Sequence, residues 1–218
     1  MILQSTAVGP FFKNGFVVGC ERTKQAVYID PGDEVEQLLA FITAEQLRVT
    51  HILLTHAHVD HVSGVAEAKR ALNVPIYLHK DDLFLYRSAV KHGMMFGLTV
   101  EEPPPVDRYY DEDPIKFGDY VVDVVHTPGH CPGGVCLAIS KKDDDGPPRL
   151  FVGDTLFAGS IGRTDLPGGD YDTLLTAITE KLFAFPGDSI VYSGHGPETT
   201  IGREKATNPF VIEYLARS

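Results

Sequence analysis

The segment from residue 56 to residue 61 reads His-Ala-His-Val-Asp-His, and it limits what this chain can fold into more than any other stretch. It follows an apolar run at 49–54 that predicts a buried strand, and it leads into a helical pattern. His56 and His58 are two residues apart, so at the end of a strand they point the same way. The Asp and the third His fall where the chain turns, within reach of a second point nearby. This geometry favours two metal ions side by side. The alternative, a polar turn with solvent-exposed histidines, leaves the density of imidazoles unexplained.

Four further segments place a carboxylate or an imidazole at the end of a predicted strand. They contain Asp30, after an apolar run; His130, in His-Thr-Pro-Gly-His; Asp154, in Phe-Val-Gly-Asp-Thr; and His195, in Tyr-Ser-Gly-His-Gly. Together with His-x-His-x-Asp-His, these segments resemble the metal-binding signature of the metallo-β-lactamase superfamily. The resemblance runs in order from about residue 10 to residue 200, nearly the whole chain. Five motifs in the order of the family are much more specific than any one of them.

The resemblance implies a hydrolytic centre with two metals. The first metal would be held by His56, His58 and His130, and the second by Asp60, His61 and His195, with Asp154 bridging both. These nitrogen and oxygen donors suit two zinc ions, with iron or manganese as alternatives. A hydroxide that bridges the metals would attack the substrate, with Asp60 and Asp154 as catalytic carboxylates. Asp30, Thr55 and Thr127 are expected to fix histidine tautomers. For the two threonines, roles as turn and cap residues are the alternative.

The order of apolar and amphipathic segments predicts an α/β protein with one domain over residues 1–218. Strands are expected at 2–8, 15–20, 25–30, 49–54, 74–78, 120–126, 135–140, 150–153 and 189–192, and helices at 33–46, 62–72, 80–91, 170–185 and 203–216. The family resemblance implies an αββα sandwich, in which two mixed sheets are flanked by helices. The Pro-rich, acidic segment 101–114 is expected to be a surface loop, with a lid over the site as the alternative.

Composition limits the classes of partner that we expect for this chain. The net charge of −11 argues against a nucleic-acid-binding surface, which requires a basic face. The apolar runs are strand-sized and the first residues do not resemble a signal peptide, so neither a membrane span nor export is indicated. The chain has an odd number of cysteines, namely Cys20, Cys131 and Cys136, and this favours a reduced, cytoplasmic location. A small-molecule substrate is therefore expected. Cys131 is either a small buried residue or a reactive or ligating thiol.

Several segments distinguish branches of the superfamily. Asp154 argues against a true β-lactamase, in which the bridging carboxylate is characteristically absent. Nuclease branches carry a large additional domain, for which this chain has no room. Gly-Asp-Thr-Leu-Phe at 153–157, followed by Gly162-Arg163, resembles the glyoxalase II-like branch, whose members hydrolyse glutathione thioesters such as S-D-lactoylglutathione. A thioester suits the site, because a leaving thiolate with a solution pKa of about 8.5 needs no dedicated general acid.

The chain departs from authentic glyoxalase II in the residues that bind glutathione. Arg163 stands where the family has a basic glutathione contact, and its alternative is a surface arginine paired to Asp165 or Asp170. Asp165 and Pro197 stand where the family has further substrate contacts. The C-terminal helical domain is missing, as in the short bacterial type II glyoxalases, which also share Gly-Arg-Thr-Asp at 162–165.

A second interpretation within the same fold is an oxidoreductase. Persulfide dioxygenases share His-x-His-x-Asp-His and Gly-Arg-Thr-Asp, and they hold one iron through two histidines and one aspartate, which here match His56, His130 and Asp154. A third is a metal-binding protein without catalysis. The sequence favours the hydrolase, since the Gly-Pro that follows His195 is less typical of the dioxygenases.

Overall fold

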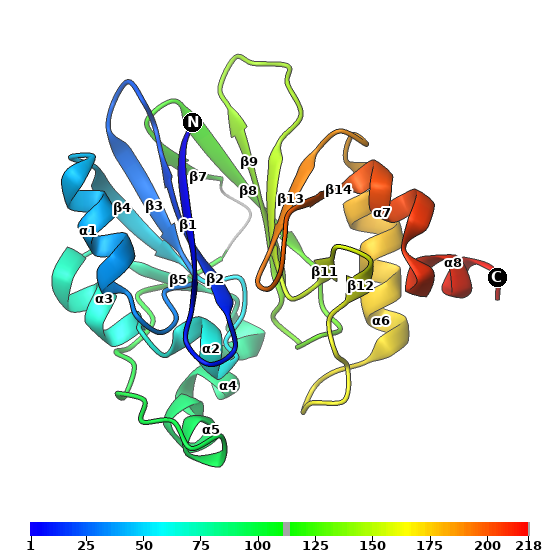
Figure 1. The fold of residues 1–218 in the computed structure, drawn as a ribbon, viewed down its shortest axis with the longest axis horizontal. Coiled ribbons are helices and arrows are strands. Elements are labelled where there is room, and N and C mark those ends of the chain that lie inside the picture. The colour runs from blue at the N-terminus through cyan, green and yellow to red at the C-terminus, as the bar shows by residue number, and fades with distance from the viewer. Residues whose placement is uncertain (111–113, 218) are drawn as a thin grey trace.

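Two six-stranded sheets pack face to face, and helices cover their outer faces (Figure 1). This architecture confirms the αββα sandwich of mixed sheets flanked by helices, in the α/β class. The structure is a computed structural model and describes residues 1–110 and 114–217. Strands between residues 2 and 109 form the first sheet, and strands between residues 115 and 200 form the second.

The first sheet combines an antiparallel meander with a parallel half. In spatial order its strands are β1 (Ile2–Val8), β2 (Lys13–Gly19), β3 (Gln25–Ile29), β4 (Arg48–Leu53), β5 (Ile76–Leu78) and β6 (Arg108–Tyr109). Neighbouring strands are antiparallel from β1 to β3 and parallel from β3 to β6. The parallel connections contain α1 (Glu36–Ala44), α2 (Val59–Val62), α3 (Val65–Leu72), η1 (Lys80–Asp82), α4 (Leu83–Arg87) and α5 (Ala89–Met95). Because parallel strands end at the same edge, the segments that follow β3 and β4 lie side by side.

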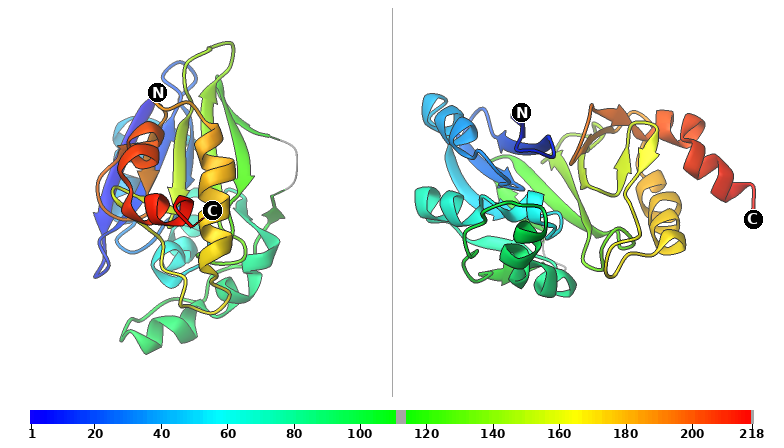
Figure 2. Two further views of the ribbon diagram at one scale, coloured as in Figure 1. Left: turned by 90° about the vertical axis from the view of Figure 1, so that its right-hand side faces the viewer. Right: turned by 60° about the horizontal axis from the view of Figure 1, so that its bottom comes forward.

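The second sheet is antiparallel except where β10 runs parallel to β13. In spatial order its strands are β14 (Thr199–Thr200), β13 (Ile190–Ser193), β10 (Arg149–Gly153), β9 (Val135–Lys141), β8 (Tyr120–His126) and β7 (Ile115–Phe117). Between β10 and β13 lie the hairpin β11 (Leu156–Phe157) and β12 (Ser160–Ile161), and then α6 (Tyr171–Thr176), η2 (Ala177–Lys181) and η3 (Leu182–Ala184). The chain ends with α7 (Ile201–Thr207) and α8 (Pro209–Leu215), which lie with α6 outside this sheet (Figure 2).

The core lies in three layers because most strands are buried on both faces. Along β3, Val27 faces the interior between the sheets while Tyr28 faces the helices outside. Between the sheets, the ring of Phe151 packs 5.1 Å from Phe16 and 5.0 Å from Tyr192. Burial of one such side chain stabilises the fold by roughly 1.5–3 kcal/mol. This packing fixes the separation of the two sheets, and therefore of the loops at their edges.

Close backbone contact divides the predicted helix 62–72. The structure has α2 and α3 with a break at Gly64, where a Cβ atom would lie 1.8 Å from the carbonyl oxygen of Gly32. The segment after Asp30 therefore crosses directly over this break. The predicted helix 80–91 is likewise divided, into η1, α4 and α5.

The two predicted helices near the end of the chain are also interrupted. The segment 170–185 changes from α6 to a π-helical turn and then to a 3₁₀ turn. The segment 203–216 is divided at Asn208, whose side chain accepts a 3.1 Å hydrogen bond from Phe210 N and caps α8. Pro209 has no N–H to continue the preceding helix and suits the first turn of the next one. The short strands β7, β11, β12 and β14 were not predicted, because two or three residues carry too little pattern.

The predicted surface loop 101–114 contains the short strand β6, which pairs with β5. Tyr110 donates a 3.0 Å hydrogen bond to Leu54 O, and Pro104 O accepts one of 2.8 Å from Tyr86. These contacts hold the described part of the loop against the first sheet. The acidic residues 111–113 of the same prediction lie outside the described residues.

Candidate metal centre

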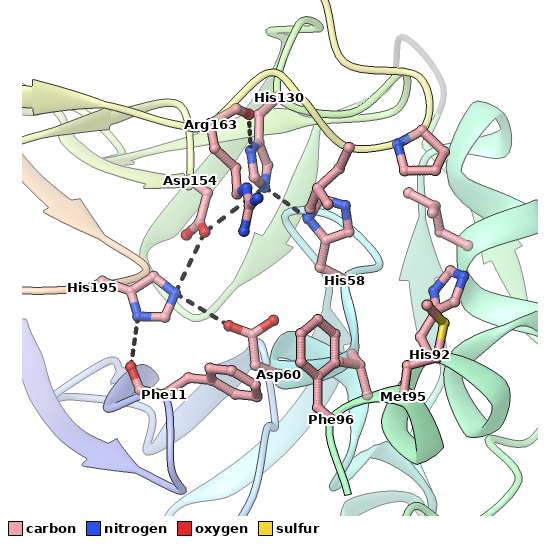
Figure 3. Close-up of a pocket in the computed structure, with 14 residues that line it drawn as sticks. Phe11, His58, Asp60, His92, Met95, Phe96, His130, Asp154, Arg163 and His195 are labelled. Atoms are coloured by element: carbon pink, nitrogen blue, oxygen red, sulfur yellow. Dashed lines mark hydrogen bonds and ion pairs between the residues drawn. The ribbon is translucent and has the colours of Figure 1, made fainter. Parts of the chain in front are cut away.

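The predicted ligands lie where strands of both sheets end. Three histidines and Asp60 follow β4, His130 lies in the β8–β9 loop, Asp154 directly follows β10, and His195 lies just beyond β13. Figure 3 shows side chains from both sides of this junction pointing toward one another. The site is therefore built from loops that the packing of the two sheets brings together.

The structure brings all seven predicted ligand residues into one cluster. Their donor atoms form three groups in which all atoms lie within 4.8 Å of one another: His56, His58 and His130; Asp60, His61 and His195; and His56, His61 and Asp154. Oδ1 of Asp154 lies 3.2 Å from His61 Nε2, and its Oδ2 lies 3.7 Å from His130 Nε2. Asp154 thus touches a member of each of the other two groups, as a bridging carboxylate must.

Hydrogen bonds on the outer side of the cluster set the histidine tautomers. Nδ1 of His130 lies 2.7 Å from Arg163 O, and Nδ1 of His195 lies 3.0 Å from Phe11 O. Because a carbonyl oxygen can only accept, Nδ1 carries the proton in both rings and Nε2 faces the cluster. A bond of this kind also fixes the orientation of each ring before any ligand arrives.

Asp30 and Thr55 hold two further rings in the same way. The carboxylate of Asp30 accepts from Thr55 N at 2.7 Å, from Thr55 Oγ1 at 2.6 Å and from His61 Nδ1 at 2.9 Å. Since the Thr55 hydroxyl donates to Asp30, it accepts from His56 Nδ1 at 3.2 Å. Thr127 was also expected to contact a histidine, but its buried hydroxyl contacts Thr155 Oγ1 at 3.2 Å and Gly134 O at 3.5 Å. Its contacts are those of the turn residue that was the alternative.

The inner atoms of the cluster fit divalent metal ions. Nε2 of His56 is buried and has no hydrogen-bond partner among the described residues, and the buried Nε2 of His61 and Oδ1 of Asp154 lie 3.2 Å apart without the geometry of a good hydrogen bond. Unpaired buried polar atoms cost about 1–3 kcal/mol each, so their convergence requires an explanation. Imidazole nitrogens and carboxylate oxygens together are the donor set of zinc, iron and manganese. A divalent cation held at this point would give each of these atoms a partner.

Burial and neighbouring charges lower the pKa of some histidines of the cluster and raise the pKa of others. Burial lowers the pKa of His56 well below its usual value, and burial aided by His130 lowers the pKa of His58 to about 3. Burial alone would also lower the pKa of His61 and His195, but the neighbouring carboxylates of Asp154 and Asp60 raise these pKa values to about 9 and about 10. In the metal-free protein at neutral pH, His61 and His195 therefore carry protons that compensate the buried carboxylates.

Metal binding should displace these protons. We expect proton release on binding to fall by one proton or more per chain between pH 8 and pH 10, as His61 and His195 lose their protons in the metal-free protein. Since both pKa values are raised, competition from protons weakens metal binding as the pH falls below 9. Isothermal titration with zinc in buffers of different ionisation enthalpy measures the release. His195→Ala should reduce the difference in proton release between pH 8 and pH 10. A proton release that does not depend on pH would contradict this prediction.

Two buried polar residues beside the cluster were missed in the sequence. The Lys13 ammonium contacts Asp30 O, and burial lowers the pKa of this lysine to about 8 despite nearby carboxylates. The Asp82 carboxylate accepts from Ala57 N at 3.0 Å and from Gly133 N at 2.6 Å. Asp82 thus joins the loop of the first three histidines to the loop of His130. Sequence patterns gave no signal for either residue, because their partners lie far away along the chain.

A glycine next to His195 also has a steric role. A Cβ atom at Gly194 would lie 2.1 Å from Asp154 Oδ1 and 2.7 Å from His61 Cε1. Only glycine leaves room for the carboxylate and the ring at this point. The Ser-Gly-His motif carried this signal, although the role of the glycine was not read from it.

The structure shows the contacts of two residues for which the sequence left alternatives open. The guanidinium of Arg163 donates to both carboxylate oxygens of Asp165, with Nε–Oδ1 and Nη2–Oδ2 distances of 2.7 Å each. Asp170 instead caps α6 by accepting from Thr173 N. Cys131 is buried and lies 3.2 Å from Asp82, and burial raises the pKa of its thiol well above the usual value, so it is an unreactive buried residue.

A pocket of about 310 Å³ opens onto the cluster. Its floor contains metal-ligand candidates, and its walls come from the β1–β2 turn, from α4 and α5, and from the loop before α6. The lining residues are Phe11, His58, Val59, Asp60, Leu85, His92, Met95, Phe96, His130, Asp154, Arg163, Leu166, Pro167 and His195. None of the described residues of segment 101–114 lines it, so the contacts give the lid interpretation no support.

The fold and the donor cluster are those of the metallo-beta-lactamase superfamily, whose family model matches residues 8–195, and the chain belongs to this superfamily. Its members are mostly hydrolytic enzymes that bind divalent metal ions. Hydroxyacylglutathione hydrolase GloC of Haemophilus influenzae is 38% identical over 191 residues, which cover 86% of this chain and 88% of that protein. Among the described residues, no helix is long and apolar enough to cross a membrane.

Two solved structures are similar over almost their full length. The crystal structure of TTHA1623 in a di-iron-bound form is 43% identical, with a TM-score of 0.83 and coverage of 95% of this chain and 99% of that one. The crystal structure of BLEG-1 B3 metallo-beta-lactamase is 37% identical, with a TM-score of 0.86 and coverage of 96% and 99%.

Proposed function

We propose that this chain is a metal-dependent hydrolase of small thioesters, of the glyoxalase II type, with S-D-lactoylglutathione as the reference substrate. The observation that carries the proposal is the position of Asp154, which contacts donors of both other groups at the floor of an open pocket. The similarity to GloC, named a hydroxyacylglutathione hydrolase, supports a thioester substrate. A pair of zinc ions is proposed as the resident metal, and the di-iron form of TTHA1623 makes iron the first alternative.

In this proposal His56, His58 and His130 would hold one cation, Asp60, His61 and His195 would hold the other, and Asp154 would contribute to both. When bound, the two cations supply hydroxide near neutral pH and polarise the carbonyl under attack. Asp60 lines the pocket, and its Oδ2 lies 3.1 Å from His195 Nε2. Its carboxylate orients the attacking water and takes up the proton as the new bond forms. The leaving group departs as a thiolate, which requires no acid from the protein.

A single-iron dioxygenase is the second candidate. That chemistry would use His56, His130 and Asp154, and because such dioxygenases share the His-x-His-x-Asp-His segment, the number of donors does not separate the two functions. The similarity to GloC favours hydrolysis, and the number of metals per chain distinguishes the two candidates.

Metal content and a substrate panel test the proposal together. Elemental analysis of protein purified without added metal should find about two metals per chain. The metal-loaded protein should hydrolyse S-D-lactoylglutathione or simpler thioesters in preference to a chromogenic β-lactam. The β-lactam is included because the chain is similar to BLEG-1, which is named a B3 metallo-beta-lactamase. One iron per chain with oxygen consumption on glutathione persulfide would establish the dioxygenase instead, and inactivity on every thioester would refute the hydrolase.

A further inference from the structure

The walls of the pocket are apolar where they leave the metal centre. Phe11, on the turn between β1 and β2, and Phe96, after α5, meet edge to face with ring centroids 5.5 Å apart and planes at 88°. Figure 3 shows both rings beside Asp60 on one side of the pocket. Met95, at the end of α5, also lines the pocket, as do Leu85, Leu166 and Pro167 from other segments. A molecule that reaches the donor cluster therefore passes between hydrophobic side chains.

These side chains are exposed to an extent unusual for their type. The exposed fraction is 74% for Met95, 56% for Phe96 and 37% for Phe11. Single exposed hydrophobic residues are common on protein surfaces, but a contiguous group at the entrance of a pocket marks a binding surface. Apolar ligand atoms placed against this group gain free energy by removing its surface from water.

The entrance offers a single arginine or lysine side chain to an anionic ligand. Arg163 is the one arginine or lysine among the described residues that line the pocket, and both oxygens of Asp165 contact its guanidinium. A glutathione moiety, whose carboxylates are ionised at neutral pH, would compete with Asp165 for this guanidinium.

We infer that the substrate carries an extended apolar group, and that Phe11, Met95 and Phe96 bind this group while the carbonyl lies over the metal centre. The inference rests on the proposed thioester hydrolysis and names its substrate class. The apolar group is attached to either the acyl or the thiol side of the thioester bond. In both cases the edge-to-face pair of Phe11 and Phe96 forms one wall, and Met95 extends it toward solvent.

Two substrate series identify the side that carries the group. One series varies the acyl chain from acetyl to octanoyl on a fixed N-acetylcysteamine thiol, and the other varies the thiol from ethanethiol to octanethiol on a fixed acetyl group. In one series kcat/KM should rise by up to about fourfold per methylene until the pocket is filled. A rise in the first series assigns the group to the acyl side, and a rise in the second assigns it to the thiol side.

Variants at the pocket entrance test whether Met95 and Phe96 bind the apolar group of the substrate. Met95→Ser and Phe96→Ser should each lower the ratio of kcat/KM for the longest over the shortest substrate by about tenfold. Met94→Ser is the matched control, because Met94 is adjacent and 72% exposed but is not among the pocket-lining residues. It should leave the ratio unchanged. Equal loss in Met94→Ser and Met95→Ser would overturn the assignment of the wall.

The outcomes separate this inference from the proposed function. If the metal-loaded protein hydrolyses acetyl thioesters and S-D-lactoylglutathione while both series remain flat, the apolar substrate class is wrong and thioester hydrolysis stands. If it hydrolyses no thioester of any length, the proposed function itself fails.

Discussion

Replacement of Asp154 by alanine should abolish both metal retention and hydrolysis. Asp154 lies 3.2 Å from His61 Nε2, 3.4 Å from His195 Nε2 and 3.7 Å from His130 Nε2, so its loss removes a donor from both proposed metals. Loss of a residue that merely supports a ligand typically costs 10–100-fold in affinity or activity, so loss of the bridging ligand should cost more than about 100-fold. Elemental analysis and initial rates on a thioester measure the two effects.

A matched control separates this effect from a general loss of charge. Asp123→Ala removes an exposed carboxylate of β8 that belongs to none of the donor groups, and should leave metal content and rate unchanged. Circular dichroism should show that the Asp154→Ala protein remains folded, since the surrounding strands pack through apolar side chains. Full activity and two metals per chain in Asp154→Ala would contradict the assignment of the site.

Replacement of Asp82 should weaken the first group of histidines without touching any of them. Its carboxylate is fully buried and accepts hydrogen bonds from Ala57 N, Gly133 N and Cys131 Sγ. Asp82→Asn puts an amide donor opposite one of these donors and should cost about 1–3 kcal/mol of unfolding free energy. Because the two histidine loops then lose their common anchor, metal affinity should fall by about 10–100-fold.

The control for this variant is the neighbouring residue. Asp81→Asn changes the adjacent carboxylate, whose side chain is 47% exposed and belongs to a separate group with His79 and His126, and should alter neither thermal stability nor the metal affinity of the predicted centre. Thermal unfolding of the metal-free proteins isolates the structural cost, at about 2–4 °C per kcal/mol for a chain of this size. Zinc titration then measures the affinity. A destabilised Asp82→Asn protein with unchanged zinc affinity would show that the loop connection does not position the ligands.

The candidate ligands could be selected from the sequence because each belongs to a local signal. Buried strands appear as short apolar runs, and the residue just beyond each run is where functional side chains of such folds lie. His56, Asp154 and His195 were found in this way, and the structure brings them into one cluster. The αββα architecture followed from the family resemblance rather than from the apolar runs themselves.

The residues that support the cluster could not be predicted, since their partners are distant in the chain. Asp82 occurs in a segment with a helical pattern, and its contacts with Ala57 and Gly133 exist only after the two sheets have packed. Lys13 lies between the predicted strands 2–8 and 15–20, yet it begins β2 and is buried against Asp30. The break at Gly64 is likewise caused by a tertiary contact with Gly32. Such effects depend on tertiary packing and leave no periodic pattern.

The distribution of the ligands along the chain has a consequence for biosynthesis. More than half of the chain separates His56 from His195, and these donors meet only when β13 has joined the second sheet. Contacts between residues so far apart form late in folding, because the loop entropy is lost before the contacts compensate it. A nascent chain that ends before β13 therefore offers an incomplete chelating set. The complete centre therefore forms only after β13 has joined the second sheet, so binding of the second metal reports that both sheets have assembled.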